Sequence, residues 1–125
     1  MTSCVYEIDG NDFSSLEGFF QAVWPLLAGE RYSGRTNLDA FNDILSWPEA
    51  PYSLVWKNSE VSRRWLDHRE IARKLERMLK TCHPSNRDDV SQRLHEARTG
   101  KGPTMFDWLV EIIRENEPHV TLRLA

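Results

Sequence analysis

Three short segments with strand-forming composition are separated by long helical stretches, and this order limits the possible folds more than any other feature. The segments are residues 3–8, 52–57 and 120–124, and the last alternates apolar and polar residues with a period of two. Strands that are joined by long helical crossovers pair in parallel within one sheet. The order therefore predicts an α/β fold, with a small three-stranded parallel sheet packed against helices.

A first helix is expected between the first two strands. Apolar residues recur at helical spacing from Leu16 to Leu27, which is typical of a helix with one buried face. Ser14 and Glu17 have the spacing of a capping box. The ring of Pro25 clashes with the preceding turn, so we expect it to end or bend this helix.

A second, shorter and acidic helix is expected over residues 36–47, with Leu38, Phe41 and Leu45 facing inward and Ile44 beside them. Thr36 and Asp39 again have capping-box spacing, so Asp39 has a possible role in the cap alone. Asp43 follows one turn later. Positions i and i+4 of a helix lie on one face about 6 Å apart, so the two carboxylates are expected to project side by side.

Residues 59–103 are interpreted as a helical insertion within a single domain that spans residues 1–125. Residues 59–99 look wholly helical except near 83–85, with Val61 and Trp65 inward and a capping box at Ser85 and Asp88. A loop at 100–103 leads to a last helix, which Thr104 and Asp107 open and which ends near 116–118.

Charge and cysteine content restrict the class of protein. The net charge is −3, but residues 58–103 hold eleven basic against seven acidic residues, whereas residues 1–57 hold eight acidic against three basic.

Two cysteines are too few for a disulfide framework; Cys4 is expected in a buried strand and Cys82 as a free thiol. With neither a leader pattern at residues 1–10 nor an apolar run of membrane-spanning length, we expect a cytoplasmic protein.

Catalytic and metal-binding patterns are weak. Cys82, His83 and His95 lack a second ligand pair at metal-binding spacing, so we expect no metal and no cofactor. The sequence has no nucleophile elbow, no glycine-rich phosphate loop and no His-Glu-x-x-His motif. An enzyme is therefore not expected.

One loop and helix carry a resemblance to a known family. Tyr32-Ser33-Gly34, followed by Asn37-Leu38-Asp39-Ala40 and then Asp43, resembles the barstar family of ribonuclease inhibitors, which shows a Tyr-x-Gly-x-Asn-Leu-Asp-Ala element with a second acid one turn later. Trp47, Leu54-Val55-Trp56 and Ile113-Arg114-Glu115 agree with the same family. The motifs extend the resemblance over residues 1–58 and 104–125, and residues 59–103 fall largely outside it.

The resemblance implies a protein that covers the active site of a cognate ribonuclease in a one-to-one complex and is monomeric when free. Carboxylates suit the Arg, Lys and His groups that hold the scissile phosphate. Glu115 would contribute to the same face, and Trp47 would border it, although core packing is the more frequent role of such a residue. By resemblance the partner-binding residues are Tyr32, Gly34, Asn37, Asp39, Asn42, Asp43, Trp47 and Glu115.

Two alternatives remain open at the level of sequence. Asn42 stands where the family usually has an aromatic residue and Arg35 adds a positive charge to the loop, which favours an immunity protein for a toxin other than a guanyl-specific ribonuclease. The bases of the insertion suggest a nucleic-acid-binding regulator. Their interleaving with Glu60, Asp67 and Glu70 favours a solvated helical face instead, so nucleic acid is not the expected partner.

Overall fold

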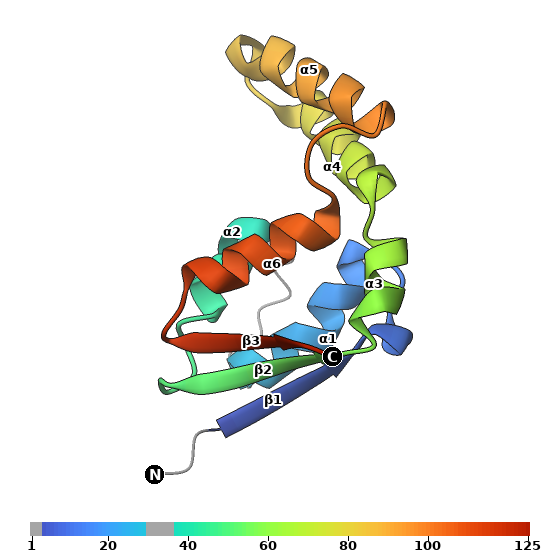
Figure 1. Ribbon diagram of the computed structural model, residues 1–125. Coiled ribbons are helices and arrows are strands. Elements are labelled where there is room, and N and C mark those ends of the chain that lie inside the picture. Colours follow the sequence, from blue (N-terminus) through green and yellow to red (C-terminus); the bar gives the residue numbers. More distant parts are fainter. Residues whose placement is uncertain (1–3, 30–36) are drawn as a thin grey trace.

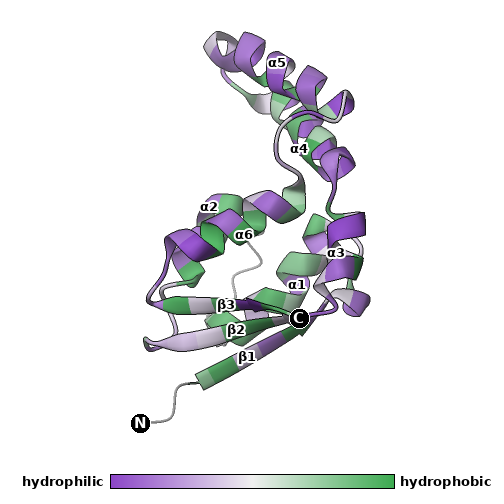
Figure 2. Cartoon of the chain, viewed as in Figure 1, coloured by the Kyte–Doolittle hydropathy of each residue, from purple (hydrophilic) through white to green (hydrophobic). Residues whose placement is uncertain are grey.

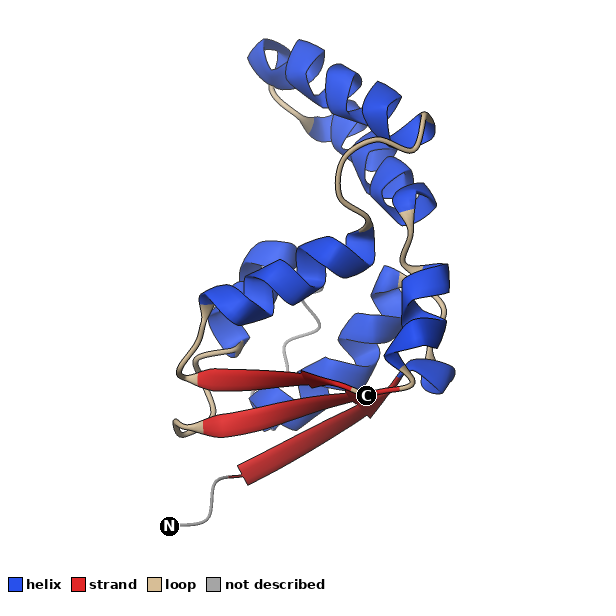
Figure 3. Ribbon diagram, viewed as in Figure 1, coloured by secondary structure: helices blue, strands red, loops and turns tan. Residues whose placement is uncertain are grey.

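A three-stranded parallel sheet forms the base of the molecule. In this computed structural model, which describes residues 4–29 and 37–125, the strand order is β1-β2-β3 and both neighbouring pairs are parallel. Tyr6 pairs with Leu54, and Leu54 pairs with Leu122. The predicted fold class is confirmed (Figures 1 and 3). The strands are β1 Cys4–Asp9, β2 Tyr52–Lys57 and β3 Val120–Leu124.

Six α-helices accompany the sheet in the described part of the chain. They are α1 Leu16–Ala28, α2 Leu38–Ile44, α3 Ser59–Trp65, α4 His68–Thr81, α5 Arg87–Arg98 and α6 Met105–Glu115, with short 3₁₀ turns η1 Gly10–Asp12 and η3 Pro84–Asn86. The expected unbroken helix before residue 83 is wrong. The chain turns at Leu66, which is fully buried, and Asp67 then caps α4 by accepting a hydrogen bond from the Arg69 backbone N–H.

Helix ends follow some of the predicted caps and not others. The Thr104–Asp107 capping box is confirmed. Ser15, not Ser14, caps α1 by accepting from the Gly18 N–H, because it is the last residue with extended backbone before the helix.

Two further expectations about helix ends are wrong. The N-cap position of α5 is Asn86, whose side chain makes no capping bond, and the Ser85 hydroxyl bonds to the His83 ring. Pro25 does not end α1, which continues to Ala28. Gln21, whose carbonyl lacks its usual helical donor four residues later, is exposed, so water can satisfy that group.

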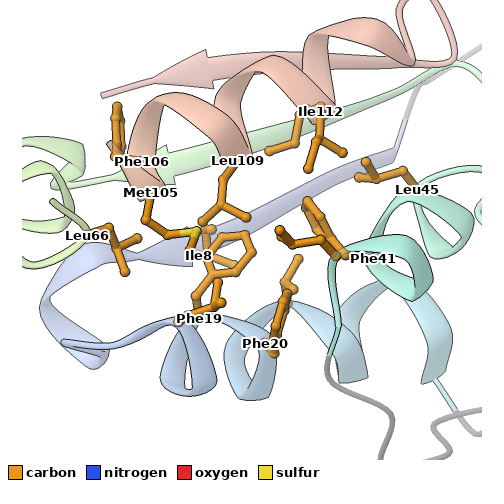
Figure 4. Close-up of a cluster of buried hydrophobic side chains, with 14 of the residues drawn as sticks. Ile8, Phe19, Phe20, Phe41, Leu45, Leu66, Met105, Phe106, Leu109 and Ile112 are labelled. Carbon is orange, nitrogen blue, oxygen red and sulfur yellow. The ribbon is translucent and has the colours of Figure 1, made fainter. Parts of the chain in front are cut away.

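The core lies between one face of the sheet and the helices above it. Alternate strand residues are buried, including Ile8, Leu54, Trp56 and Val120. Phe19 of α1 packs edge-on against Phe41 of α2, with ring centroids 5.3 Å apart. Figure 4 shows side chains from α1, α2 and α6 meeting in this cluster. Such aromatic packing stabilises the fold without disulfide bonds.

Two apolar residues expected inside the protein lie at its surface. Cys4 is the first residue of the edge strand β1 and is exposed. Trp65 is 51% exposed because the last turn of α3 presents it outward while Leu66 enters the core. These two expectations are therefore wrong.

The helices α4 and α5 pack together as a hairpin at one end of the molecule (Figure 1). Figure 2 shows that α5 is largely hydrophilic. Glu70 anchors the hairpin to the body: its buried carboxylate accepts the Leu16 N–H at 3.0 Å and pairs with Arg73 at 2.7 Å.

Among the described residues, no helix is long and apolar enough to cross a bilayer.

Candidate functional site

The short helix α2 is held firmly on its inner side. Leu38, Phe41 and Ile44 are buried in the core, as the helical spacing predicts. Asn37 caps the helix, with its side-chain oxygen accepting the Ala40 N–H at 2.7 Å. This cap replaces the expected capping box of Thr36 and Asp39, since Asn37 is the residue that directly precedes the first helical turn.

The outer side of α2 carries the two acids. Asp39 and Asp43 are both exposed, and neither carboxylate forms an ion pair within 4.0 Å among the described residues. They are one turn apart and therefore share a face, with Cβ atoms about 6 Å apart. Two charges without such partners on a rigid helix are free to meet an external cationic group.

A polar contact joins α2 to the end of α6. Asn116, which follows α6, donates a side-chain hydrogen bond of 2.9 Å to the Asn42 side-chain oxygen and another to the Ile112 carbonyl. Glu115 is the last residue of α6 and is exposed. The contact brings the end of α6, including the acid expected from the resemblance, to the side of α2.

The turn after α2 is fixed by backbone and side-chain bonds. The Ser46 hydroxyl donates to the Asp43 carbonyl at 2.8 Å, and the Trp47 N–H donates to the Ile44 carbonyl at 3.1 Å. Tyr52 of β2 donates its hydroxyl to the Leu45 carbonyl and so attaches this turn to the sheet. Trp47 is 38% exposed, so the expectation that it packs in the core is wrong. Its surface position beside α2 fits the bordering role.

Not every expected site residue can be placed. Tyr32 and Gly34 lie outside the described residues, as does Arg35. The structure thus brings Asn37, Asp39, Asn42 and Asp43 together on one short helix and its cap.

A cleft lies between α1, the start of α2 and α4. It has a volume of about 270 Å³, and its walls include Asn37 and Leu38 at the start of α2 and Lys74 of α4. Burial lowers the pKa of Lys74, the neighbouring carboxylate of Asp39 opposes this shift, and Arg77 adds to it. Sequence patterns place Lys74 only within a basic helix. Its proximity to Asp39 depends on packing between segments far apart in the chain.

Many basic residues of α4 and α5 already have acidic partners. Arg69 pairs with Asp67 at 2.9 Å, and Arg77 pairs with Glu17 at 2.8 Å. Arg98 pairs with Glu76 at 2.8 Å. These pairs favour the solvated, internally neutralised face over a nucleic-acid-binding surface.

Within residues 4–29 and 37–125, no group of three His, Cys, Asp or Glu side chains is arranged to hold a metal ion.

The fold and the acidic helix define a class of small α/β protein with an exposed anionic face. The family model described as "Barstar (barnase inhibitor)" matches residues 4–100, and the chain belongs to the barstar family. None of the curated proteins matches the chain. The family is one of protein inhibitors rather than enzymes, and it points to an inhibitor of a barnase-type ribonuclease.

The extent of the family match differs from the extent expected from the motifs. The matched residues run through the insertion to residue 100 and end before α6 and β3. The motifs, in contrast, place 59–103 largely outside the resemblance and include 104–125. The helices α3, α4 and α5 therefore lie within the matched part of the chain.

Proposed function

We propose that this protein inhibits a cognate ribonuclease by covering its active site with the outer face of α2 and the loop that precedes it. The observation that carries the proposal is the exposed pair Asp39 and Asp43 on a helix whose inner face is buried in the core. A rigid pair of carboxylates can meet the Arg, Lys and His groups of such an enzyme with charge-assisted hydrogen bonds. RNA is then excluded because the same cationic groups are occupied.

The two acids are expected to contribute unequally. Asp39 lies in the first turn of α2, where its charge interacts favourably with the helix dipole, and Lys74 is near it. Asp43 lies in the last turn, where the helix dipole does not favour a carboxylate. We therefore expect Asp43 to be the dominant contact and Asp39 the lesser one. Glu115 and Trp47 would border the interface, with Tyr32 and Gly34 completing it.

The supporting experiment is a titration of barnase and other secreted microbial ribonucleases with the purified chain. One-to-one loss of RNA cleavage is expected for the cognate enzyme. Asp43→Ala should weaken the best complex by about 2–5 kcal/mol, because truncation leaves a buried cation of the partner unpaired. Asp88→Ala on α5 removes the same charge from an exposed acid of the hairpin and should leave the affinity unchanged.

The outcome also separates the alternatives. If Asp43→Ala changes the binding free energy of the complex by less than about 0.5 kcal/mol, α2 does not cover the active site in the proposed way. The chain could instead bind a toxin of a different fold tightly and one-to-one, and inhibit no ribonuclease. That result would mean that the protein is an inhibitor whose target is not a ribonuclease. Asn42 and Arg35 remain the sequence features that favour this second target.

Location and oligomeric state follow from the same proposal. An inhibitor of this kind is expected to act in the cytoplasm, as a free monomer that forms a one-to-one complex. Light scattering of the free chain and of the complex measures both stoichiometries. Binding to generic RNA or DNA at low salt would instead support the regulatory alternative.

A further inference from the structure

Lys74 differs from the other cations that line the cleft between α2 and α4. Arg77 pairs with Glu17 at 2.8 Å, and Arg73 pairs with Glu70 at 2.7 Å. Lys74 is partly buried, but within residues 4–29 and 37–125 it makes no ion pair within 4.0 Å. The wall of the cleft therefore holds one cation whose charge is not matched by a contacting carboxylate.

The position of Lys74 is set by the anchoring of α4. Glu70 lies one turn before it and bonds to the Leu16 N–H, while Arg77 lies three residues after it and bonds to Glu17. Both contacts attach α4 to the first turns of α1. Lys74 is thus held between two fixed points, beside the start of α2.

We propose that Lys74 is part of the partner-binding face and selects ribonucleases that carry a carboxylate beside their cationic active site. This inference rests on the proposed function of α2. The cations of the enzyme meet Asp43 and Asp39, and a neighbouring carboxylate enters the cleft to meet Lys74. The helix α4 is then a specificity element, which adds one positive charge at the border of an acidic surface.

Charge complementarity supports this choice of partner. A carboxylate that enters the cleft supplies the contacting anion that Lys74 lacks, and it is sheltered there from solvent screening. An enzyme that presents only cations at this position meets a like charge, and such juxtaposition is a common means of rejecting the wrong partner. Asp39 limits the repulsion but does not contact Lys74 as an ion pair within 4.0 Å.

The test uses barnase and a panel of secreted microbial ribonucleases, with inhibition constants measured for several variants of the full chain. Lys74→Met keeps the aliphatic stem and removes the charge, while Lys74→Glu reverses it. For the ribonuclease that is inhibited best, we expect affinity to fall about tenfold with Lys74→Met and further with Lys74→Glu. Lys74→Arg should retain most of the affinity.

Lys80→Glu is the matched control, because Lys80 is exposed on the same helix and does not line the cleft. It should change the affinity by less than about twofold. Urea unfolding of each variant separates binding from folding. A merely structural Lys74 would lower the unfolding midpoint and leave the inhibition constant of the folded protein unchanged.

A double-mutant cycle identifies the partner group. Each acidic residue that borders the active site of the inhibited ribonuclease is replaced by its amide and combined with Lys74→Met. One carboxylate should show coupling of about tenfold, and the others should be additive. The inference is overturned if the effect of Lys74→Met is additive with the loss of every carboxylate, or if Lys74→Met and Lys74→Glu inhibit as well as wild type. Either result leaves the proposed function intact. If the wild-type chain inhibits no ribonuclease, both fail.

Discussion

The side chain of Asn116 donates a 2.9 Å hydrogen bond to the side-chain oxygen of Asn42, joining two residues separated by 74 positions in the sequence. Asn42 lies between the two acids of α2, and Asn116 follows the last residue of α6. The bond therefore holds the acidic helix against the helix that ends with Glu115.

Removal of this bond should weaken inhibition indirectly. Asn116→Ala deletes the bonds to Asn42 and to the Ile112 carbonyl, and we expect a loss of about 1 kcal/mol in the free energy of unfolding. Inhibition should fall less than with Asp43→Ala, because the carboxylates remain. Denaturant unfolding and inhibition titrations measure the two effects. Equal stability of Asn116→Ala and wild type would contradict the prediction.

Tyr52 is expected to be important for the stability of the turn after α2. Its buried hydroxyl donates to the Leu45 carbonyl, so Tyr52→Phe leaves this carbonyl without its donor and should cost about 1–3 kcal/mol. Tyr6→Phe is the control, since Tyr6 packs edge-on against Tyr52 and no hydrogen bond of its hydroxyl is found among the described residues. Thermal or urea unfolding should show a much smaller change for Tyr6→Phe.

The same tyrosine should make the protein sensitive to alkaline pH. Burial raises the pKa of Tyr52 well above its ordinary value, with Tyr6 adding to the shift. The folded state therefore binds the phenolic proton more tightly than the unfolded state. This contribution to stability is complete below about pH 10, the pKa of an unperturbed tyrosine, and decreases as the pH rises above it.

Urea unfolding at several pH values between 9 and 11 measures this dependence. Tyr52→Phe should show a shallower loss of stability over this range than wild type, because it lacks the titrating group. If the two proteins lose stability in parallel, Tyr52 is not the group responsible.

Glu70 is expected to hold α4 against the start of α1. Its carboxylate is buried, accepts the Leu16 N–H and pairs with Arg73, so Glu70→Ala leaves the Leu16 N–H without its acceptor, while Arg73 keeps its 3.8 Å pair with Glu17. We expect a loss of about 1–3 kcal/mol in the free energy of unfolding, because a buried backbone donor is left unsatisfied. Glu76→Ala on the same helix removes an exposed pair with Arg98 and should cost less than about 1 kcal/mol. Comparable losses for the two variants would argue against the anchoring role.

Local patterns were sufficient where the physical cause is local. Alternation in β3 reflects one buried face, and the Thr104–Asp107 box depends on residues three positions apart, so both are correctly predicted. The inward face of α2 follows from helical periodicity in the same way. The Tyr-Ser-Gly and Asn-Leu-Asp-Ala pattern, with Asp43 after it, leads to the family that the match over residues 4–100 establishes.

Where neighbouring residues offer similar local chemistry, the sequence was not sufficient. Ser14 and Ser15 are both good caps, and in the folded chain Ser15, directly before the buried Leu16, is the cap. Trp65 and Leu66 are both apolar, and packing space favours Leu66 inside. A pattern of residue types cannot distinguish such pairs, because the selection depends on what the rest of the chain places next to them.

By itself, the sequence determined the parallel α/β framework, from the order of its strands and helices, and the shared face of Asp39 and Asp43, from helical spacing. It also carried the motif whose resemblance pointed to the family. Only the tertiary structure decided what surrounds that face. It brings Asn116 to Asn42, attaches the following turn to Tyr52 and places Lys74 near Asp39. These contacts join residues on different elements, and their energies depend on packing, burial and local screening, which no single segment of the sequence contains.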